Sequence, residues 1–358
     1  MKRFLQKILI YGSFANAILL VLSYLSTHFS PDIFPYLSFL GIFYPLMLIT
    51  ACISFMYYAF QKKKYAFVHL AAILLGWNHI GDLISTGSEK EAGGEKFKVM
   101  SYNVRQFNRY LWIKDKEVGS GIKSFIEDQK PDILCIQEFY SREDKLNYQD
   151  SIIEAQNTNS YLISYKYEKK YSGNAIFSKF PIINEGMINI GISNRKCIYA
   201  DIALAHDTIR VYSLHLASMH LSYEDYDLIE GLSSEKKEQK VSSALNLWVK
   251  LAKAYEIRAR EIRFILPHLK TSPYPTIICG DFNDPPMSYA YRSIKKHFKD
   301  AFEECGSGIG RTYTRFSPTF RIDYILHNAE LFPMQFERHE IELSDHYPIT
   351  CTFGTKHE

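Results

Sequence analysis

The sequence predicts an α/β protein in which two β-sheets pack face to face with helices on their outer faces, preceded by a helical membrane region. In residues 97–358, short β-rich runs alternate with polar loops and a few helical stretches. This density of strands in about 260 residues indicates two packed sheets. In residues 1–84, three long stretches are almost free of charge, which is typical of membrane helices. The hydrophobic content of 47% is ample for a core.

The three apolar stretches are residues 4–25, 36–60 and 65–84. The first two are each about as long as a helix that crosses the bilayer, and we predict both to be transmembrane. A cleaved signal peptide fits the first stretch less well, because another apolar stretch follows at once and no small-residue cleavage site closes the first. The third stretch contains several polar residues, so it is either a third span, with Trp77 at the interface, or a buried amphipathic helix.

Loop charges predict the orientation of these helices. Basic residues lie at the start of the first stretch and after the second: Lys2, Arg3, Lys7, Lys62, Lys63 and Lys64. The intervening loop, residues 27–35, carries only Asp32. By the positive-inside rule both basic ends are cytoplasmic, and a third crossing then places the rest of the chain outside the cytoplasm. We therefore expect a multi-pass protein of the cell (inner) membrane whose domain after residue 85 is extracytoplasmic.

Residues 85–96 are rich in Gly, Glu and Lys and are predicted to be a flexible linker between the anchor, residues 1–84, and the domain formed by residues 97–358. Subtracting the 8 basic and 5 acidic residues of positions 1–96 from the totals of 42 and 39 leaves 34 of each in that domain. Proteins that hold long nucleic acids usually carry a basic excess. The balance argues against duplex DNA as the substrate, although a local basic patch remains compatible with it.

The six cysteines do not form a disulfide or zinc pattern. Cys52 lies in a membrane stretch, and Cys135, Cys279 and Cys351 lie in apolar runs, where a free cysteine behaves as a small core residue. The pattern does not assign the remaining two.

Eight runs are predicted to be strands: residues 97–104, 133–137, 175–177, 198–203, 209–215, 276–279, 322–326 and 349–353. Helices are predicted at residues 121–129 and at about 234–269. The second has one apolar face with Lys and Arg opposite, the ordinary pattern of a helix packed on a sheet. Its basic face is interpreted as solvated, with nucleic-acid or membrane binding as the alternative.

Polar residues in five distant segments lie at or just past the ends of strand-like runs. The segments are Tyr102-Asn103-Val104, Gln137-Glu138, Gly280-Asp281-Phe282-Asn283, Arg321-Ile322-Asp323-Tyr324 and Ser344-Asp345-His346-Tyr347-Pro348. Such strand ends converge in one cleft, and acids, amides and imidazoles are the groups that metal-assisted phosphoester hydrolysis needs. Taken singly, Asp323 fits a strand-end cap and Asn103 a turn residue equally well, but the whole set predicts a catalytic site.

The spacing and identity of these motifs resemble the endonuclease/exonuclease/phosphatase superfamily, which includes deoxyribonuclease I, abasic-site endonucleases, neutral sphingomyelinases and inositol polyphosphate 5-phosphatases. The resemblance covers about residues 97–353. It implies a four-layer α/β/β/α sandwich with the active site at the loop ends of the two sheets.

The resemblance also implies a divalent cation, Mg²⁺ with Mn²⁺ as a substitute, and no other cofactor. Glu138 matches the main metal ligand, a hard carboxylate suited to a hard ion. Asn103 matches the residue that helps to hold the metal or the scissile phosphate. Asp345 matches the acidic residue beside the metal, where it either binds the metal directly or contacts one of its ligands. His215 matches the histidine that donates to a non-bridging phosphate oxygen, where negative charge grows in the transition state.

Four further positions complete the implied mechanism. Asp281 and Asn283 match the pair that positions the attacking water and the phosphate, and Asn283 is thus also a substrate contact. His346 matches the general base, and Asp323 the carboxylate that fixes its tautomer and orientation. The implied reaction is in-line attack of an activated water on phosphorus.

The sequence says less about the substrate. Asn174 is a candidate substrate contact, with a turn at Gly173 as the simpler interpretation. Residues 219–240, with His220, Tyr223 and Tyr226, form either a lip over the site or a disordered excursion. Residues 310–316 mix cations with aromatics, a combination that suits a phosphate or a ring.

Tethering to a membrane brings lipid head groups to the site at high effective concentration. We therefore expect a membrane lipid or another phosphate ester as the substrate. Two alternatives are an extracytoplasmic membrane-anchored nuclease, which would make nucleic acid the partner, and an inactive membrane-anchored binding protein. The complete set of site residues disfavours the last. No obligate protein partner is evident.

Overall fold

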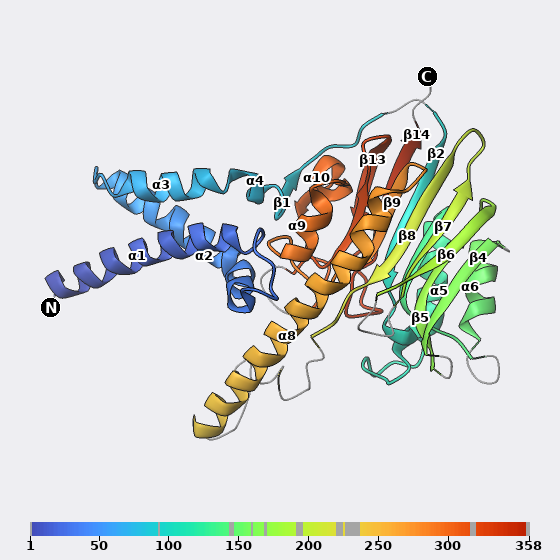
Figure 1. Ribbon diagram of the computed structural model, residues 1–358, viewed down its shortest axis with the longest axis horizontal. Helices are drawn as coiled ribbons and strands as arrows, with labels where there is room; N and C mark the ends of the chain where they lie inside the picture. Colours follow the sequence, from blue (N-terminus) through green and yellow to red (C-terminus); the bar gives the residue numbers. More distant parts are fainter. Residues whose placement is uncertain are drawn as a thin grey trace. The chain divides into compact units, whose positions relative to one another are not determined.

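A computed structural model describes the following residues: 2–91, 94–142, 147–158, 160–167, 170–190, 196–219, 225, 237–315 and 320–355. The chain, shown in Figure 1, divides into two compact units. The first unit consists of Met1–Asp82, Ala217–Arg260 and Pro285–Arg292. The second consists of Leu83–Leu216, Glu261–Asp284 and Ser293–Glu358.

The first unit begins with two long apolar helices, α1 (Lys2–Leu25) and α2 (Ser38–Phe60), and the 3-10 turn η1 (Pro35–Leu37) leads into α2. The helical segments Arg3–Leu25 and Pro35–Phe60 are long and apolar enough to cross a membrane. The two helices run antiparallel, since Ser13 lies 3.1 Å from the Tyr58 hydroxyl and the rings of Tyr24 and Tyr44 lie 6.0 Å apart. This pair is consistent with a membrane anchor.

The third apolar stretch is interrupted. Helix α3 (Ala66–Leu75) has 10 residues, about 15 Å, which is half the thickness of the hydrocarbon core. Helix α4 (Trp77–Ile80) follows after Gly76, where a Cβ atom would lie 2.1 Å from the Tyr24 ring. The ring of Tyr58 stacks on His69, and Tyr24 donates a hydrogen bond of 2.9 Å to the Ala72 carbonyl. The stretch therefore runs back beside α1 and α2, and its crossing of the membrane stays a prediction.

The end of α1 and the start of α2 pack against the later segments of the same unit. Ser26 donates to the Met287 carbonyl at 3.1 Å, and the Phe39 ring meets Trp248 edge to face at 4.3 Å. Arg292 forms an ion pair with the buried Asp82. Because α2 runs from Ser38 to Phe60, these contacts lie at the end of the helix pair opposite Lys62.

The second unit contains two sheets, each of six strands among the described residues. In spatial order, the first sheet is β10 (Lys299–Asp300), β12 (Asp323–His327), β9 (Thr276–Asp281), β8 (Thr208–His215), β7 (Lys196–Ala203) and β6 (Ile182–Asn189). The second is β13 (Leu331–Arg338), β14 (Ile349–Thr355), β2 (Lys96–Asn103), β3 (Ile133–Tyr140), β5 (Lys170–Ser178) and β4 (Ser160–Tyr167). Each has one parallel pair at its centre, β8 with β9 and β2 with β3.

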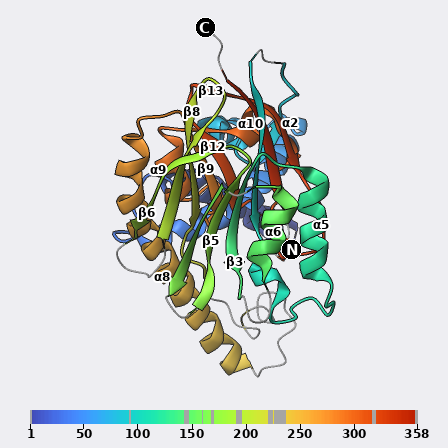
Figure 2. The same cartoon turned by 90° about the vertical axis from the view of Figure 1, so that its right-hand side faces the viewer.

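Alternating side chains of the central strands build two cores. Val99 and Cys135 of one sheet pack with Val211 and Ile277 of the other in the core between the sheets. Met100, Leu134 and their neighbours point the other way and pack under α5 (Val118–Gln129) and α6 (Tyr148–Gln156). These two helices lie against the sheet that holds β3 (Figure 2).

A helix also covers the outer face of the first sheet. The Tyr212 hydroxyl of β8 lies 2.9 Å from Nδ1 of His268, near the end of α8 (Lys237–Lys270). The expected four-layer α/β/β/α sandwich is therefore confirmed. The remaining short elements are η2 (Arg105–Asn108), α9 (Tyr289–Lys295), α10 (Ala301–Cys305), and the paired strands β1 (Ile84–Thr86) and β11 (Ser307–Ile309). All six cysteines are free, and five, including Cys197 and Cys305, are buried.

The described part of the expected linker, residues 85–96, is hydrogen-bonded to the second unit. It starts within β1, whose Ser85 pairs with Gly308. Further on, the Lys90 amide donates to Met334 at 2.8 Å and the Thr355 amide donates to Glu95 at 3.1 Å. Composition alone suggested a flexible segment. It does not show these hydrogen bonds, because their partners lie far away in the sequence.

Candidate active site

The sequence-predicted site residues all belong to the second unit, and strand register brings them together. Asn103 and Glu138 come from the second sheet, at the ends of the parallel pair β2 and β3. The first sheet supplies His215 at the end of β8, opposite Asp281 at the end of β9. Asp323, the first residue of β12, pairs with Asp281. The site is therefore built by both sheets at one end of the sandwich.

Asp281 is the centre of this cluster. The Asn103 side-chain amide donates to Asp281 at 3.0 Å, and Asn283 donates to it through its backbone amide at 2.7 Å and its side chain at 3.2 Å. The Nε2 atoms of His215 and His346 lie 3.6 and 3.8 Å from the same carboxylate. A further bond between the sheets, from Gln137 to Ser213 at 3.3 Å, lies beside the cluster.

Unusual backbone geometry places these side chains. At Gly280, a Cβ atom would lie 2.0 Å from the Leu214 carbonyl oxygen, so only glycine lets β8 and β9 bring His215 next to Asp281. Glu138 and Asn283 have φ angles of 52° and 53°, in the left-handed region that non-glycine residues avoid. The register of β3 against β5 also shifts next to Glu138. Such strain is typical of functional sites.

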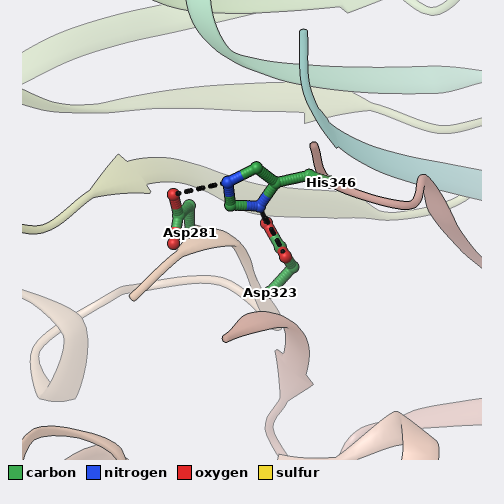
Figure 3. A group of neighbouring side chains, drawn as sticks. All are labelled: Asp281, Asp323 and His346. Carbon is green, nitrogen blue, oxygen red and sulfur yellow. Dashed lines mark hydrogen bonds and ion pairs between the residues drawn. The ribbon is translucent and has the colours of Figure 1, made fainter. Parts of the chain in front are cut away.

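His346 and Asp323 form a buried hydrogen-bonded pair (Figure 3). Nδ1 of His346 lies 2.9 and 3.2 Å from the two Asp323 oxygens, which leaves Nε2 directed at Asp281. Burial lowers the pKa of His346, but attraction to Asp323 and Asp281 outweighs it and raises that pKa to about 10. Burial raises the pKa of Asp281 to about 7, against the opposing effect of His346.

Asp281, Asp323 and His346 each offer a ligand atom, and these atoms lie within 4.8 Å of one another. The trio is compact enough to hold a cation. However, both Asp323 oxygens face Nδ1 of His346, which suits proton transfer better than metal coordination.

Glu138 fits a divalent cation better. Its side chain is 28% exposed, and Oε1 lies 3.9 Å from Nε2 of His215. Burial and the nearby Asp345 raise the pKa of Glu138, while His346, Arg105 and a hydrogen bond from Asn103 lower it. A hard carboxylate whose charge is disfavoured by its surroundings is well matched to a hard cation such as Mg²⁺.

Asp345, the other predicted acidic ligand, forms an ion pair that the sequence did not reveal. Nη1 of Arg105 lies 2.6 Å from Asp345 Oδ2. The backbone amide of Arg105 donates to Oδ1 of Asn103 at 3.0 Å. Ser344 donates to the Asn103 carbonyl at 2.8 Å and ties this segment to β2. The only sequence signal for Arg105 is its position two residues after Asn103.

The predicted substrate contacts have varied surroundings. Asn174 is buried in β5 and lies 3.5 Å from the Ser213 carbonyl, so it bridges the two sheets, and its substrate role stays a prediction. In the aromatic and basic segment, Arg311 donates to the Tyr313 carbonyl at 2.9 Å, and the Tyr313 ring lies 5.1 Å from the His346 ring. Residues 220, 223, 226 and 316 lie outside the described residues.

Comparisons with known proteins agree with this geometry. Residues 100–346 match the sequence profile described as the Endonuclease/Exonuclease/phosphatase family, and residues 6–83 match a domain of unknown function. No curated protein matches the chain.

Three similar solved structures have TM-scores just above 0.5. A Bacteroides thetaiotaomicron endonuclease/exonuclease/phosphatase family protein is 18% identical with a TM-score of 0.53, and the match covers 74% of this chain and 100% of that one. A mannosyl-6-phosphatase of the same organism is 18% identical with a TM-score of 0.52, covering 72% and 99%. Humanized D. rerio TDP2 is 17% identical with a TM-score of 0.52, covering 73% and 99%. At these identities the likeness shows the fold.

Proposed function

Since the chain belongs to the endonuclease/exonuclease/phosphatase family, whose members are phosphoester hydrolases, we propose that it is a membrane-anchored, divalent-metal-dependent phosphoesterase. Its substrate is a phosphodiester or phosphomonoester in a lipid head group or another membrane-proximal molecule. The reaction is in-line attack of water on phosphorus. The carrying observation is the convergence of His346, Asp323 and Asp281 beside Glu138 and His215.

The buried pair of His346 and Asp281 takes the proton of the attacking water. Asp323 accepts from Nδ1 of His346 at 2.9 Å and so fixes the ring with Nε2 towards Asp281. Asn283 and Asn103 donate to Asp281 and hold its carboxylate in one orientation. A water bound against Asp281 is thus oriented by fixed groups before the reaction begins.

On the other side of Asp281, His215 supplies a donor for a phosphate oxygen. Its Nε2 lies between Asp281 at 3.6 Å and Glu138 at 3.9 Å. Glu138, together with Asn103, would hold the cation, which when bound supplies positive charge for the phosphate oxygens. His215 adds its hydrogen bond where negative charge increases in the transition state.

A lipid head group is our preferred substrate class because two helices are long and apolar enough to span a membrane, and because the catalytic domain is formally neutral. The fold does not choose by itself, since the similar structures include a mannosyl-6-phosphatase and TDP2 complexed with single-strand DNA product. An extracytoplasmic nuclease is therefore the alternative. An inactive binding protein is disfavoured because every predicted catalytic residue is present in the converged cluster.

The full chain, purified in detergent with Mg²⁺, is expected to release phosphorylated head groups or phosphate from a membrane lipid extract at least tenfold faster than it nicks plasmid DNA. The effective concentration of head groups near the anchor provides the reason. Mass spectrometry of the lipid products and gel analysis of the plasmid measure the two rates. EDTA is the control and should abolish both. Rapid nicking with untouched lipids would reverse our ranking of substrates.

We also propose that the catalytic domain is extracytoplasmic. The third apolar stretch starts just after Lys62, Lys63 and Lys64 and runs back beside α1, as the contacts of His69 and Ala72 indicate. Met287 and Arg292 pack at the opposite end of the helix pair. With the lysines in the cytoplasm, this arrangement supports a domain on the other side.

A reporter enzyme that is active only outside the cytoplasm, fused after Glu358, is expected to be active in cells. The same reporter fused after Lys64 is the matched control and should be inactive, because residues 62–64 carry three lysines. A cytoplasmic signal from the Glu358 fusion would mean that residues 65–84 do not cross the membrane.

A further inference from the structure

The segment that follows Asn103 contains a left-handed turn. Arg105, Gln106, Phe107 and Asn108 have φ angles of 44°, 54°, 53° and 56°. Left-handed backbone costs about 1–2 kcal/mol per non-glycine residue, so four in succession require strong support from their surroundings.

That support is present on both sides of the turn. The Phe107 ring stacks on Tyr148 at 4.1 Å. The side chain of Asn108 donates to the carbonyls of Ile113 at 2.8 Å and Asp115 at 2.9 Å, and it accepts from the Ile113 amide at 3.0 Å. The turn is therefore fixed by its neighbours, and its geometry fixes Arg105.

Arg105 engages two of the three predicted metal ligands. Its guanidinium lies 2.6 Å from Asp345 Oδ2, and its backbone amide donates to Oδ1 of Asn103 at 3.0 Å. The Trp112 ring lies 4.4 Å from the guanidinium carbon and holds the side chain by a cation–π contact. The side chains of Arg105 and Asp345 are only 20% and 11% exposed, so solvent screens their attraction weakly.

We propose that Arg105 limits the active site to a single divalent cation, with its guanidinium standing where a second cation would bind Asp345. This inference rests on the proposed function, because it concerns the same metal site. A guanidinium keeps its charge at any physiological pH. A second cation at Asp345 would face this fixed positive charge and would have to displace a short ion pair. Glu138 remains as the carboxylate that binds the one cation.

Mn²⁺ binding to the full chain in detergent tests this proposal by calorimetry and electron paramagnetic resonance. The wild-type protein is expected to bind one Mn²⁺ with the signal of an isolated ion. Arg105→Gln should bind that ion about tenfold more tightly, because a nearby positive charge is removed. Arg105→Asp should bind two ions with a spin-coupled signal. Arg109→Gln is the matched control and should behave as wild type, since Arg109 stacks on Tyr140 at 4.3 Å.

Two bound ions in the wild-type protein would overturn the inference and leave the proposed function standing. Either an unchanged Mn²⁺ affinity in Arg105→Gln or a single bound ion in folded Arg105→Asp would also overturn it. The glutamine variant keeps the test decisive if the aspartate variant fails to fold. No Mn²⁺ binding by the folded wild-type protein would instead overturn the proposed metal-dependent function itself.

Discussion

Replacing Glu138 with glutamine is expected to lower kcat/KM for phosphoester hydrolysis by about 10³-fold or more. The substitution keeps the size of the side chain and removes the carboxylate best matched to a divalent cation, and a bound cation supplies several kcal/mol of transition-state stabilisation. Glu138 also lies 3.9 Å from His215, so loss of its charge alters the surroundings of the histidine that donates a hydrogen bond to the phosphate. Steady-state hydrolysis of bis-p-nitrophenyl phosphate with Mg²⁺ or Mn²⁺ measures the effect.

Glu127→Gln is the matched control, because Glu127 is a 44% exposed carboxylate that pairs with Lys123 on a helix surface. It should keep full activity. Glu138→Gln should also weaken Mn²⁺ binding, which separates loss of the metal from general misfolding. Wild-type turnover in Glu138→Gln would refute the assigned site.

Replacing His346 with glutamine is expected to lower kcat by about 10²–10⁴-fold, the usual contribution of a positioned acid–base group. Asp323→Asn should cause part of the same loss, because it removes the negative charge beside Nδ1 and leaves only one of the two oxygens that lie 2.9 and 3.2 Å from that atom. The full pH profile of kcat for the three proteins measures this. His339→Gln is the control. Nε2 of His339 lies 3.0 Å from the Thr350 hydroxyl, and neither residue belongs to the candidate site.

The raised pKa of His346 also predicts how the stability of the fold depends on pH. The folded-state pKa of His346 is about 10, against about 6.5 in an unfolded chain. Its protonation therefore stabilises the fold fully below pH 6.5, and this stability is lost as the pH rises to about 10. The folded-state pKa of Asp281 is also raised, to about 7. Its contribution to stability is therefore lost as the pH rises from about 4 to about 7, below the range in which His346 acts. Urea unfolding in EDTA should show a steeper loss above pH 7 in wild type than in His346→Gln; equal slopes would contradict the pKa assignment.

Sequence patterns predicted the central strands of both sheets and missed the edges. Strands such as β3 are buried along most of their length and appear as apolar runs. Within these two sheets, the four strands without a prediction, β4, β6, β10 and β13, are the edge strands. β6 is mostly solvent-facing, and β13 contains Pro333 and several polar residues. Because edge strands face solvent and often carry polar residues or proline, they lack the continuous apolar run that marks a central strand.

For the site, residue chemistry predicted which side chains converge, because acids and histidines at strand ends are rarely structural. Arg105 was not predicted, since its position depends on a left-handed turn supported by Tyr148 and Asn108, which no local pattern encodes. The helix break at Gly76 was likewise missed. A Cβ atom at Gly76 would lie 2.1 Å from the Tyr24 ring, a contact with a residue distant in the sequence that no local pattern shows.

The candidate active site also lies at the contact between the two sheets. Asn103 of one sheet donates to Asp281 of the other, and Gln137 donates across to Ser213. A slip of one sheet against the other by a single residue step, about 3.3 Å, would break these bonds and separate Glu138 from His215. Phosphoesterase activity should therefore depend on the alignment of the two sheets. On heating, we expect this activity to be lost at a lower temperature than the β-sheet structure.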